Sequence, residues 1–258
     1  MRQIPPSAGR DDLLACLAEV RSAKADRPQS PTNARHLKTV QLILAFLFLA
    51  NRLPAADTNA VLDHWFAAQK QLQSWSADFI QTRTLKTLTR PLTTPGHVDF
   101  ALPDEFRWEL GKPARTIAVG GSGEMVVIYP LLKRAERYPL GQNAPKQWRD
   151  TMSLLQAGFP HDQQEFESEF QVQSLAETNG VWQLVLQPKS TFARQMMPEL
   201  HLGLATNDYS LTSTEMVFAD GSRMRSDFTN AVLNPMLDKS VFDRQPPAGF
   251  KVTEPLSQ

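Results

Sequence analysis

The stretch of sequence that decides the fold is GHVDFALPDEFRWEL, residues 96–110. Apolar and polar residues alternate in both of its halves, as they do in β-strands that bury one face. Val98 and Phe100 share a face in the first half, and Phe106 and Trp108 share a face in the second. The stretch therefore predicts two consecutive strands, each with an apolar face that carries aromatic side chains.

The same period of two residues extends outward in both directions. Asn179-Gly180 and Asp220-Gly221 are strong signals for hairpin turns. The alternation predicts strands at residues 76–88, 96–102, 106–110, 116–119, 124–129, 133–140, 166–175, 181–187, 199–205, 211–218 and 223–228. About ten to eleven strands in serial antiparallel hairpins favour a mainly β fold, with helices added, that is built on one large curled sheet.

Two segments follow a helical period instead. Residues 59–73 place apolar side chains near i, i+3 or i+4, and i+7, which predicts an amphipathic helix. Residues 145–159 predict a second, inserted helix, because apolar residues recur on one of its faces: Trp148, Met152, Leu155 and Phe159. Two helices are too few for a complete outer layer over the sheet, but they suit a lid over its concave face.

The N-terminal part of the chain is typical of an export signal. The apolar run VQLILAFLFLA, residues 40–50, is shorter than the ~20 residues that span a bilayer. Basic residues precede it and small residues follow it, so residues 37–56 are predicted to be a signal peptide cleaved after Ala55 or Ala56. We interpret residues 1–36 as an N-terminal extension upstream of the true translation start. Residues 57–258 are expected to form one soluble periplasmic domain.

The bulk composition excludes several classes of protein. Lys and Arg total 27, as do Asp and Glu, so the formal charge of the 258-residue chain is zero. This balance, with a pI near 7.0, argues against nucleic-acid binding. The apolar content of 41% and the mean hydropathy of −0.34 argue against a polytopic membrane protein. Cys16 is the only cysteine and precedes the predicted domain, which therefore relies on packing without disulfides.

The sequence offers little catalytic chemistry. None of the five histidines has the spacing of a metal site. The segment GGSGE, residues 120–124, approaches a nucleophile elbow, but its last residue is Glu and it joins two predicted strands, so it is interpreted as a turn. We therefore predict no catalytic residue, no metal and no cofactor, and a protein that is not an enzyme.

Four motifs together resemble the LolA family of outer-membrane lipoprotein carriers. WSADFIQ, residues 75–81, is similar to the family's first-strand motif, aromatic-x-A-x-F-x-Q. Residues 96–109 resemble its G-x-(apolar)-x-(aromatic)-x-x-P-x-x-F-x-W stretch. Residues 121–130, which end in IYP, follow in the same order, and SVF with PPAG, within residues 240–249, is similar to its closing motif. The resemblance covers residues 58–254.

The resemblance implies an unclosed antiparallel β-barrel whose mouth is covered by helices. It also implies a soluble, monomeric periplasmic shuttle without catalysis. An inner-membrane ABC-type releasing complex would load it with acylated lipoproteins, and an outer-membrane receptor would unload it. One position departs from the family pattern. Well-studied carriers have an Arg that latches the lid directly before the motif's Pro, where this chain has Leu102, and Arg107 is expected to point away from Phe106 and Trp108.

An acyl-chain carrier needs an apolar cavity with a cover that can move. The candidate cavity floor consists of Phe79, Phe100, Phe106, Trp108, Val127 and Tyr129, and the candidate lid of Trp148, Met152 and Leu155. Ordinary core packing explains any single one of these residues as well. Two alternative functions stay open: a periplasmic carrier of another lipid or acyl product, and a non-enzymatic half-barrel that binds or senses a partner. A hydrolase is the least favoured reading.

Overall fold

Twelve strands form a single sheet in the computed structural model, which describes residues 58–121, 123–160 and 162–256. The strands are β1 (Ser74–Thr84), β2 (Leu92–Ala101), β3 (Glu105–Leu110), β4 (Thr116–Gly121), β5 (Glu124–Tyr129), β6 (Arg134–Pro139), β7 (Phe170–Thr178), β8 (Val181–Pro188), β9 (Glu199–Ala205), β10 (Leu211–Val217), β11 (Arg223–Leu233) and β12 (Lys251–Thr253). The helices are α2 (Thr58–Gln69), α3 (Lys146–Gln156), α4 (Gln163–Glu169) and α5 (Thr191–Met196), with the 3₁₀ turns η2 (Pro130–Leu132), η3 (Gly141–Asn143) and η4 (Lys239–Phe242). The predicted signal peptide and the extension before it lie outside the described residues.

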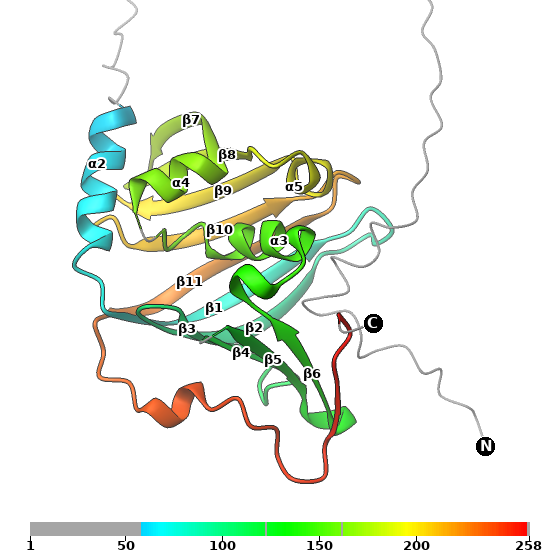
Figure 1. Ribbon diagram of the computed structural model, residues 1–258. Coiled ribbons are helices and arrows are strands. Elements are labelled where there is room, and N and C mark those ends of the chain that lie inside the picture. Colours follow the sequence, from blue (N-terminus) through cyan, green and yellow to red (C-terminus); the bar gives the residue numbers. More distant parts are fainter. Residues whose placement is uncertain (1–57, 122, 161, 257–258) are drawn as a thin grey trace, which may run out of the picture.

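The strand order is β12-β6-β5-β4-β3-β2-β1-β11-β10-β9-β8-β7. The chain therefore enters at the middle of the sheet, runs outward to β6, crosses to β7 at the other edge, and returns to β11 beside β1. Every pair is antiparallel except β12 with β6, and the sheet curls without closing (Figure 1). The prediction of an unclosed, mainly antiparallel sheet with helices is confirmed, with twelve strands in place of ten or eleven.

Three elements differ from the prediction. Residues 166–169, predicted to start a strand, belong to α4, because the Asp162 carboxylate caps this helix by accepting a hydrogen bond from the Glu165 N–H at 2.7 Å. Helix α5 is only six residues long and shows no sequence period. Strand β12 was not predicted, and its three residues pair in parallel with β6.

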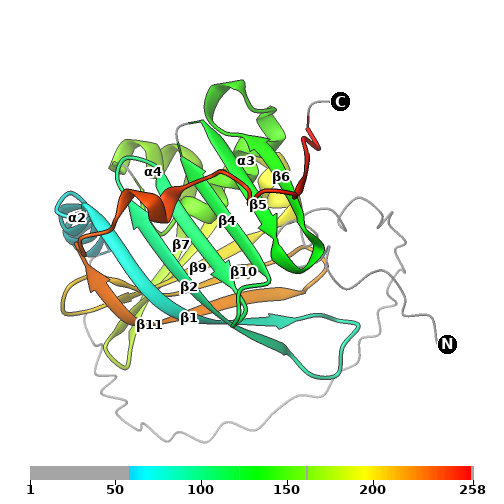
Figure 2. The same ribbon diagram turned by 90° about the horizontal axis from the view of Figure 1, so that it is seen from below.

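The crossover from β6 to β7 covers the concave face of the sheet. It contains α3 and α4; in Figure 1, α3 lies between the two halves of the curled sheet, and α4 lies beside α2 over the half that contains β8 and β9. The segment after β11 lies on the opposite, convex face, where it crosses the strands on its way to β12 (Figure 2). There Arg244 forms an ion pair with Glu105 at 2.8 Å. None of the described helices is long and apolar enough to cross a bilayer.

The main apolar core lies between the helices and the concave face. Helix α2 closes one end of it with Trp65 and Phe66, whose ring centroids lie 5.3 and 5.5 Å from that of Phe166 in α4. Both contacts have edge-on geometry, which aromatic pairs favour. The amphipathic face predicted for residues 59–73 thus packs on the crossover and holds it against the sheet.

Two glycines let aromatic rings lie flat on the concave face. Gly96 of β2 pairs with Phe79 of β1, and Gly120 of β4 pairs with Phe106 of β3. A Cβ atom on Gly96 would lie 2.1 Å from Cζ of Phe79, and one on Gly120 would lie 2.1 Å from Cε1 of Phe106. Each ring occupies the space that a side chain would take on the neighbouring strand.

Replacing Gly120 with Ala is expected to lower the free energy of unfolding by about 1–3 kcal/mol, because the new methyl group overlaps the Phe106 ring. The three heavy atoms nearest to the added Cβ all belong to Phe106. The double variant with Phe106→Ala should therefore show strong non-additivity in urea unfolding, since it removes the overlap. Additive effects of the two substitutions would contradict this account of the pair.

Candidate lipid-binding cavity

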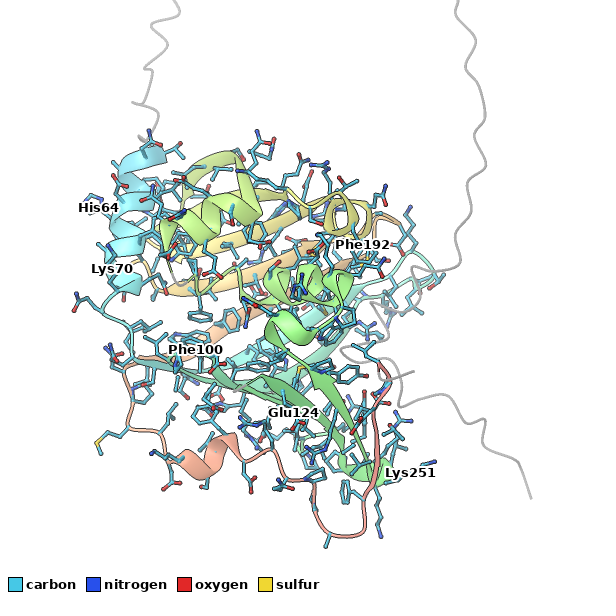
Figure 3. All side chains as sticks on the ribbon, viewed as in Figure 1. His64, Lys70, Phe100, Glu124, Phe192 and Lys251 are labelled. Atoms are coloured by element: carbon cyan, nitrogen blue, oxygen red, sulfur yellow. The ribbon has the colours of Figure 1, made fainter. Side chains whose placement is uncertain are left out.

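A cavity of about 120 Å³ lies between the concave face and the crossover. Helix α3 and the loop after it form its roof, and strands from both halves of the sheet form its floor. Its apolar lining includes Val98, Phe100, Phe106, Trp108, Met125, Met152, Leu155, Phe159, Leu200, Leu202, Leu211, Met216, Met224 and Phe228. Figure 3 labels Phe100, on the side of β2 that faces the crossover. The mixture of aromatic rings and flexible methionines suits a ligand that is apolar and variable in shape.

The predicted site residues occupy three different places. Those that line the cavity are Phe100, Phe106, Trp108, Met152 and Leu155. Phe79 lies under the floor, with its ring centroid 4.2 Å from that of Trp108. Val127, Tyr129 and Trp148 belong to a second apolar cluster around β5 and β6, beside the cavity.

Sequence reasoning did not assign several other wall residues to the site. Met216, Met224 and Phe228 come from β10 and β11, strands that received no site residue, although their alternation places these side chains on one face of the sheet. Gln81 lies on the inward face of β1 and belongs to the motif at residues 75–81, but it received no site role. Phe159 is the last residue of the helix predicted at residues 145–159, and its helical period could have assigned it to the lid together with Met152 and Leu155.

Phe159 closes one part of the cavity. Its ring stacks on Phe100 with centroids 4.9 Å apart and an interplanar angle of 15°, and it also contacts Trp75 at 5.0 Å. Phe159 follows closely after the end of α3, so its contacts join this end of the helix to the floor. The floor and the roof therefore share one continuous set of apolar contacts.

Helix α3 is fastened to β6 at its N-terminal end. The Trp148 indole N–H donates a hydrogen bond to the carbonyl oxygen of Pro139 at 2.8 Å, and the ring stacks on Tyr138 with centroids 4.9 Å apart. The Tyr138 hydroxyl donates to Glu136 at 2.8 Å. Burial, reinforced by Glu136, raises the pKa of Tyr138 well above its usual range and that of Tyr129 to about 12, so both phenols stay neutral.

A second attachment joins α3 to α5. The Ser190 hydroxyl donates to Asp150 at 2.5 Å, and the Lys146 ammonium lies 3.0 Å from the same carboxylate. Burial alone would raise the pKa of Asp150, but the hydrogen bonds from Ser190 and Lys146 lower it below its ordinary value of 3.8. This contact therefore stabilises the closed position above that pH and is lost as the pH falls through the lowered pKa.

The family model for the outer-membrane lipoprotein carrier protein LolA matches residues 70–245. The chain belongs to the LolA family. Outer-membrane lipoprotein carrier proteins are similar to it over most of its length. The one from Dechloromonas aromatica is 23% identical and covers 84% of this chain and 98% of its own. The one from Methylibium petroleiphilum is 26% identical and covers 81% of this chain and 95% of its own.

Among solved structures, an uncharacterised conserved protein from Thermus thermophilus superposes with a TM-score of 0.46 at 11% identity. The match covers 76% of this chain and 98% of that one. The LolA family consists of periplasmic carriers that are not enzymes, in agreement with the predicted absence of catalysis.

Position 102, where the LolA resemblance leads one to look for an Arg latch, is occupied by a leucine that is 43% exposed. Arg107 does not take over, because it lies on the convex face, where it donates to Glu109 at 2.6 Å and to the carbonyl oxygen of Val241 at 3.2 Å. In this LolA family member, α3 is attached by the contacts of Trp148 and Asp150, without an Arg at position 102.

The sheet register of this LolA relative brings together a Ser–His–Asp chain that spacing in the sequence did not reveal. Ser76 Oγ lies 3.3 Å from His97 Nε2, and His97 Nδ1 lies 2.8 Å from Asp78. The three side chains stand on the convex face, away from the cavity, on strands that are paired on both sides. An open strand surface of this kind provides neither a substrate pocket nor free backbone N–H groups for an oxyanion. The arrangement therefore does not reopen the hydrolase reading.

Replacing Ser190 with Ala is expected to loosen α3 by removing the donor to Asp150. Loss of one such hydrogen bond corresponds to about 1 kcal/mol, or about a fivefold faster amide exchange in α3. Hydrogen exchange followed by mass spectrometry measures this directly. Ser168→Ala is the matched control, because its hydroxyl donates within α4, to Glu165 at 2.8 Å. Equal exchange of α3 in both variants would show that the Ser190 contact does not hold the lid.

Proposed function

We propose that this LolA family member is a periplasmic carrier that holds the acyl chains of lipoproteins in the cavity under α3 and moves them from the inner to the outer membrane. The observation that supports the proposal most is the apolar cavity under α3. Only a few polar contacts attach this helix to the rest of the described structure. Residues 37–56 would direct export and be removed, which leaves residues 57–258 as the carrier domain.

A carrier must shield its acyl chain from water, because exposure of the chain is costly in free energy. Each exposed CH₂ group costs about 0.8 kcal/mol, so a sixteen-carbon chain costs on the order of 10 kcal/mol. A wall of aromatic and aliphatic side chains recovers this free energy without any charge. The polar protein–cargo contacts can then stay few, which lets the cargo leave when a receptor offers an equally apolar site.

The proposed carrier function requires α3 to move, because the cavity is small. A volume of about 120 Å³ is close to that of an engineered cavity of about 150 Å³ that admits benzene, and is far too small for an acyl chain. In our proposal this arrangement is the closed form of the carrier. In our proposal, Met152, Leu155 and Phe159 leave the floor when cargo enters, so the lid and the cargo compete for one surface and the net affinity stays low.

The nine predicted site residues divide by role in this proposal. Phe100, Phe106 and Trp108 contact cargo from the floor, and Met152 and Leu155 contact the same surface from the lid. Those that act indirectly, by supporting the floor or seating α3 against β6, are Phe79, Val127, Tyr129 and Trp148.

The partners follow from the family resemblance. We propose that an inner-membrane ABC-type releasing complex loads the carrier, that an outer-membrane receptor unloads it, and that the carrier works as a monomer. No nucleic acid takes part, in keeping with the balanced charge of the chain.

Two observations favour alternatives. Leu102 in place of the latching Arg favours a carrier of another lipid or acyl product. The small closed cavity favours a half-barrel that binds or senses a protein partner. Mass spectrometry of the ligand that remains bound after gentle purification from the periplasm separates the three: a triacylated lipoprotein supports our proposal, another lipid supports the first alternative, and no lipid supports the second.

Replacing Leu155 with Asp is expected to weaken the binding of a fluorescent triacylated lipopeptide at least tenfold, because it places a carboxylate on the cavity wall. Gln147→Asp is the matched control, since it puts the same carboxylate on the exposed face of α3. Circular dichroism checks that both variants keep the fold. Equal affinity of the two variants would argue against cargo binding under α3.

A further inference from the structure

One polar row crosses the otherwise apolar concave face. Gln81 of β1 pairs in register with Ser226 of β11, which pairs with Thr214 of β10. Directly paired residues of antiparallel strands point to the same side of the sheet. All three residues line the cavity under α3. The hydroxyls and the amide therefore form a line across its floor.

The row lies within the cavity and not at its rim. On β11, the inward neighbours of Ser226 are Met224 on one side and Phe228 on the other, and both also line the cavity. An elongated ligand on this floor must therefore cross the polar row while its apolar parts lie on the neighbouring side chains.

Gln81 is the member of the row that most needs a partner. Its side chain is 1% exposed, and among the described residues neither its Oε1 nor its Nε2 has a hydrogen-bond partner. The indole Nε1 of Trp108, another wall residue, is likewise buried without a partner there. Buried amides are almost always hydrogen-bonded, because leaving them unpaired costs stability. An apolar residue such as Met would fill the same space without that cost.

The donor set indicates the ligand. The Gln81 amide offers two N–H donors and one acceptor, and the Trp108 indole adds a third donor. A plain hydrocarbon chain can satisfy none of them, whereas the carbonyl oxygen of an acyl ester or amide accepts such bonds. A carbonyl joined to a long alkyl chain would meet the row while the chain covers the apolar wall.

We propose that Gln81 is a specificity residue that donates a hydrogen bond to the carbonyl of an acyl group bound in the cavity. Ser226 and Thr214 extend the polar row beside it. The inference rests on the proposed carrier function and narrows it: the cavity selects acyl esters or amides over other apolar chains. In this proposal, the Gln81 amide gains a hydrogen-bond partner only when an acyl carbonyl is bound.

The test compares three small probes on the full chain: methyl decanoate, N-methyldecanamide and decyl methyl ether. The ether is the ester without its carbonyl oxygen. Each probe displaces the fluorescent dye N-phenyl-1-naphthylamine from the wild type, from Gln81→Met and from the matched control Gln171→Met, which changes an exposed residue of edge strand β7. The ester and amide arms distinguish O-linked from N-linked acyl groups.

The wild type and the control should bind the carbonyl probes about fivefold more tightly than the ether, the effect of one hydrogen bond. Gln81→Met should lose this preference, keep its affinity for the ether, and melt at a higher temperature. Equal affinity of the wild type for ester, amide and ether would overturn the inference while leaving the carrier function intact. An equal loss for all probes in Gln81→Met would also overturn it. If no probe displaces the dye, the carrier function itself fails, and the inference fails with it.

Discussion

A sheet that curls without closing leaves an apolar concave face that the protein must cover with something that is not a strand. Here the cover is the crossover that carries the chain from β6, next to one edge of the sheet, to β7 at the other edge. Exposed apolar surface costs roughly 25 cal/mol per Å², so the sheet and the crossover stabilise each other through this one contact. Any apolar guest that enters must replace the same contact.

The sheet and helix α3 therefore have different roles within the domain. Strand pairing over twelve strands fixes the frame, and its hydrogen bonds are independent of what lies on the concave face. Helix α3 is held by apolar packing and by a few polar contacts, of which those of Trp148 and Asp150 are the best defined. Such contacts contribute about 0.5–1.5 kcal/mol each, which is enough to seat a helix and too little to prevent its release by a long acyl chain.

The sequence predicted the sheet well, because alternation and turn signals are local properties of each hairpin. It placed Phe106 and Trp108 on the concave face for that reason. Alternation fixes the face of a strand but not the depth below its surface, and so it did not distinguish Phe79, which lies under Trp108, from the rings that line the cavity. The helical period likewise put Trp148 in phase with Met152, although Trp148 reaches past the cavity to β6.

Other features depend on pairing between distant strands, which no local pattern contains. The polar row requires the register of β1 with β11 and that of β11 with β10, and the Ser76–His97–Asp78 chain requires the register of β1 with β2. Helix α4 was missed for a different reason: its alternating glutamates match a solvated strand, and only the cap at Asp162 marks a helix.

The central claim is that α3 and the cargo compete for one surface, and hydrogen exchange of the loaded carrier tests it most directly. Ligands usually slow exchange in the segments around their site. Here we predict that a saturating triacylated lipopeptide makes the amides of α3 exchange faster than in the empty protein, while the strands stay protected. Slower or unchanged exchange in α3, with cargo shown to be bound, would contradict the account.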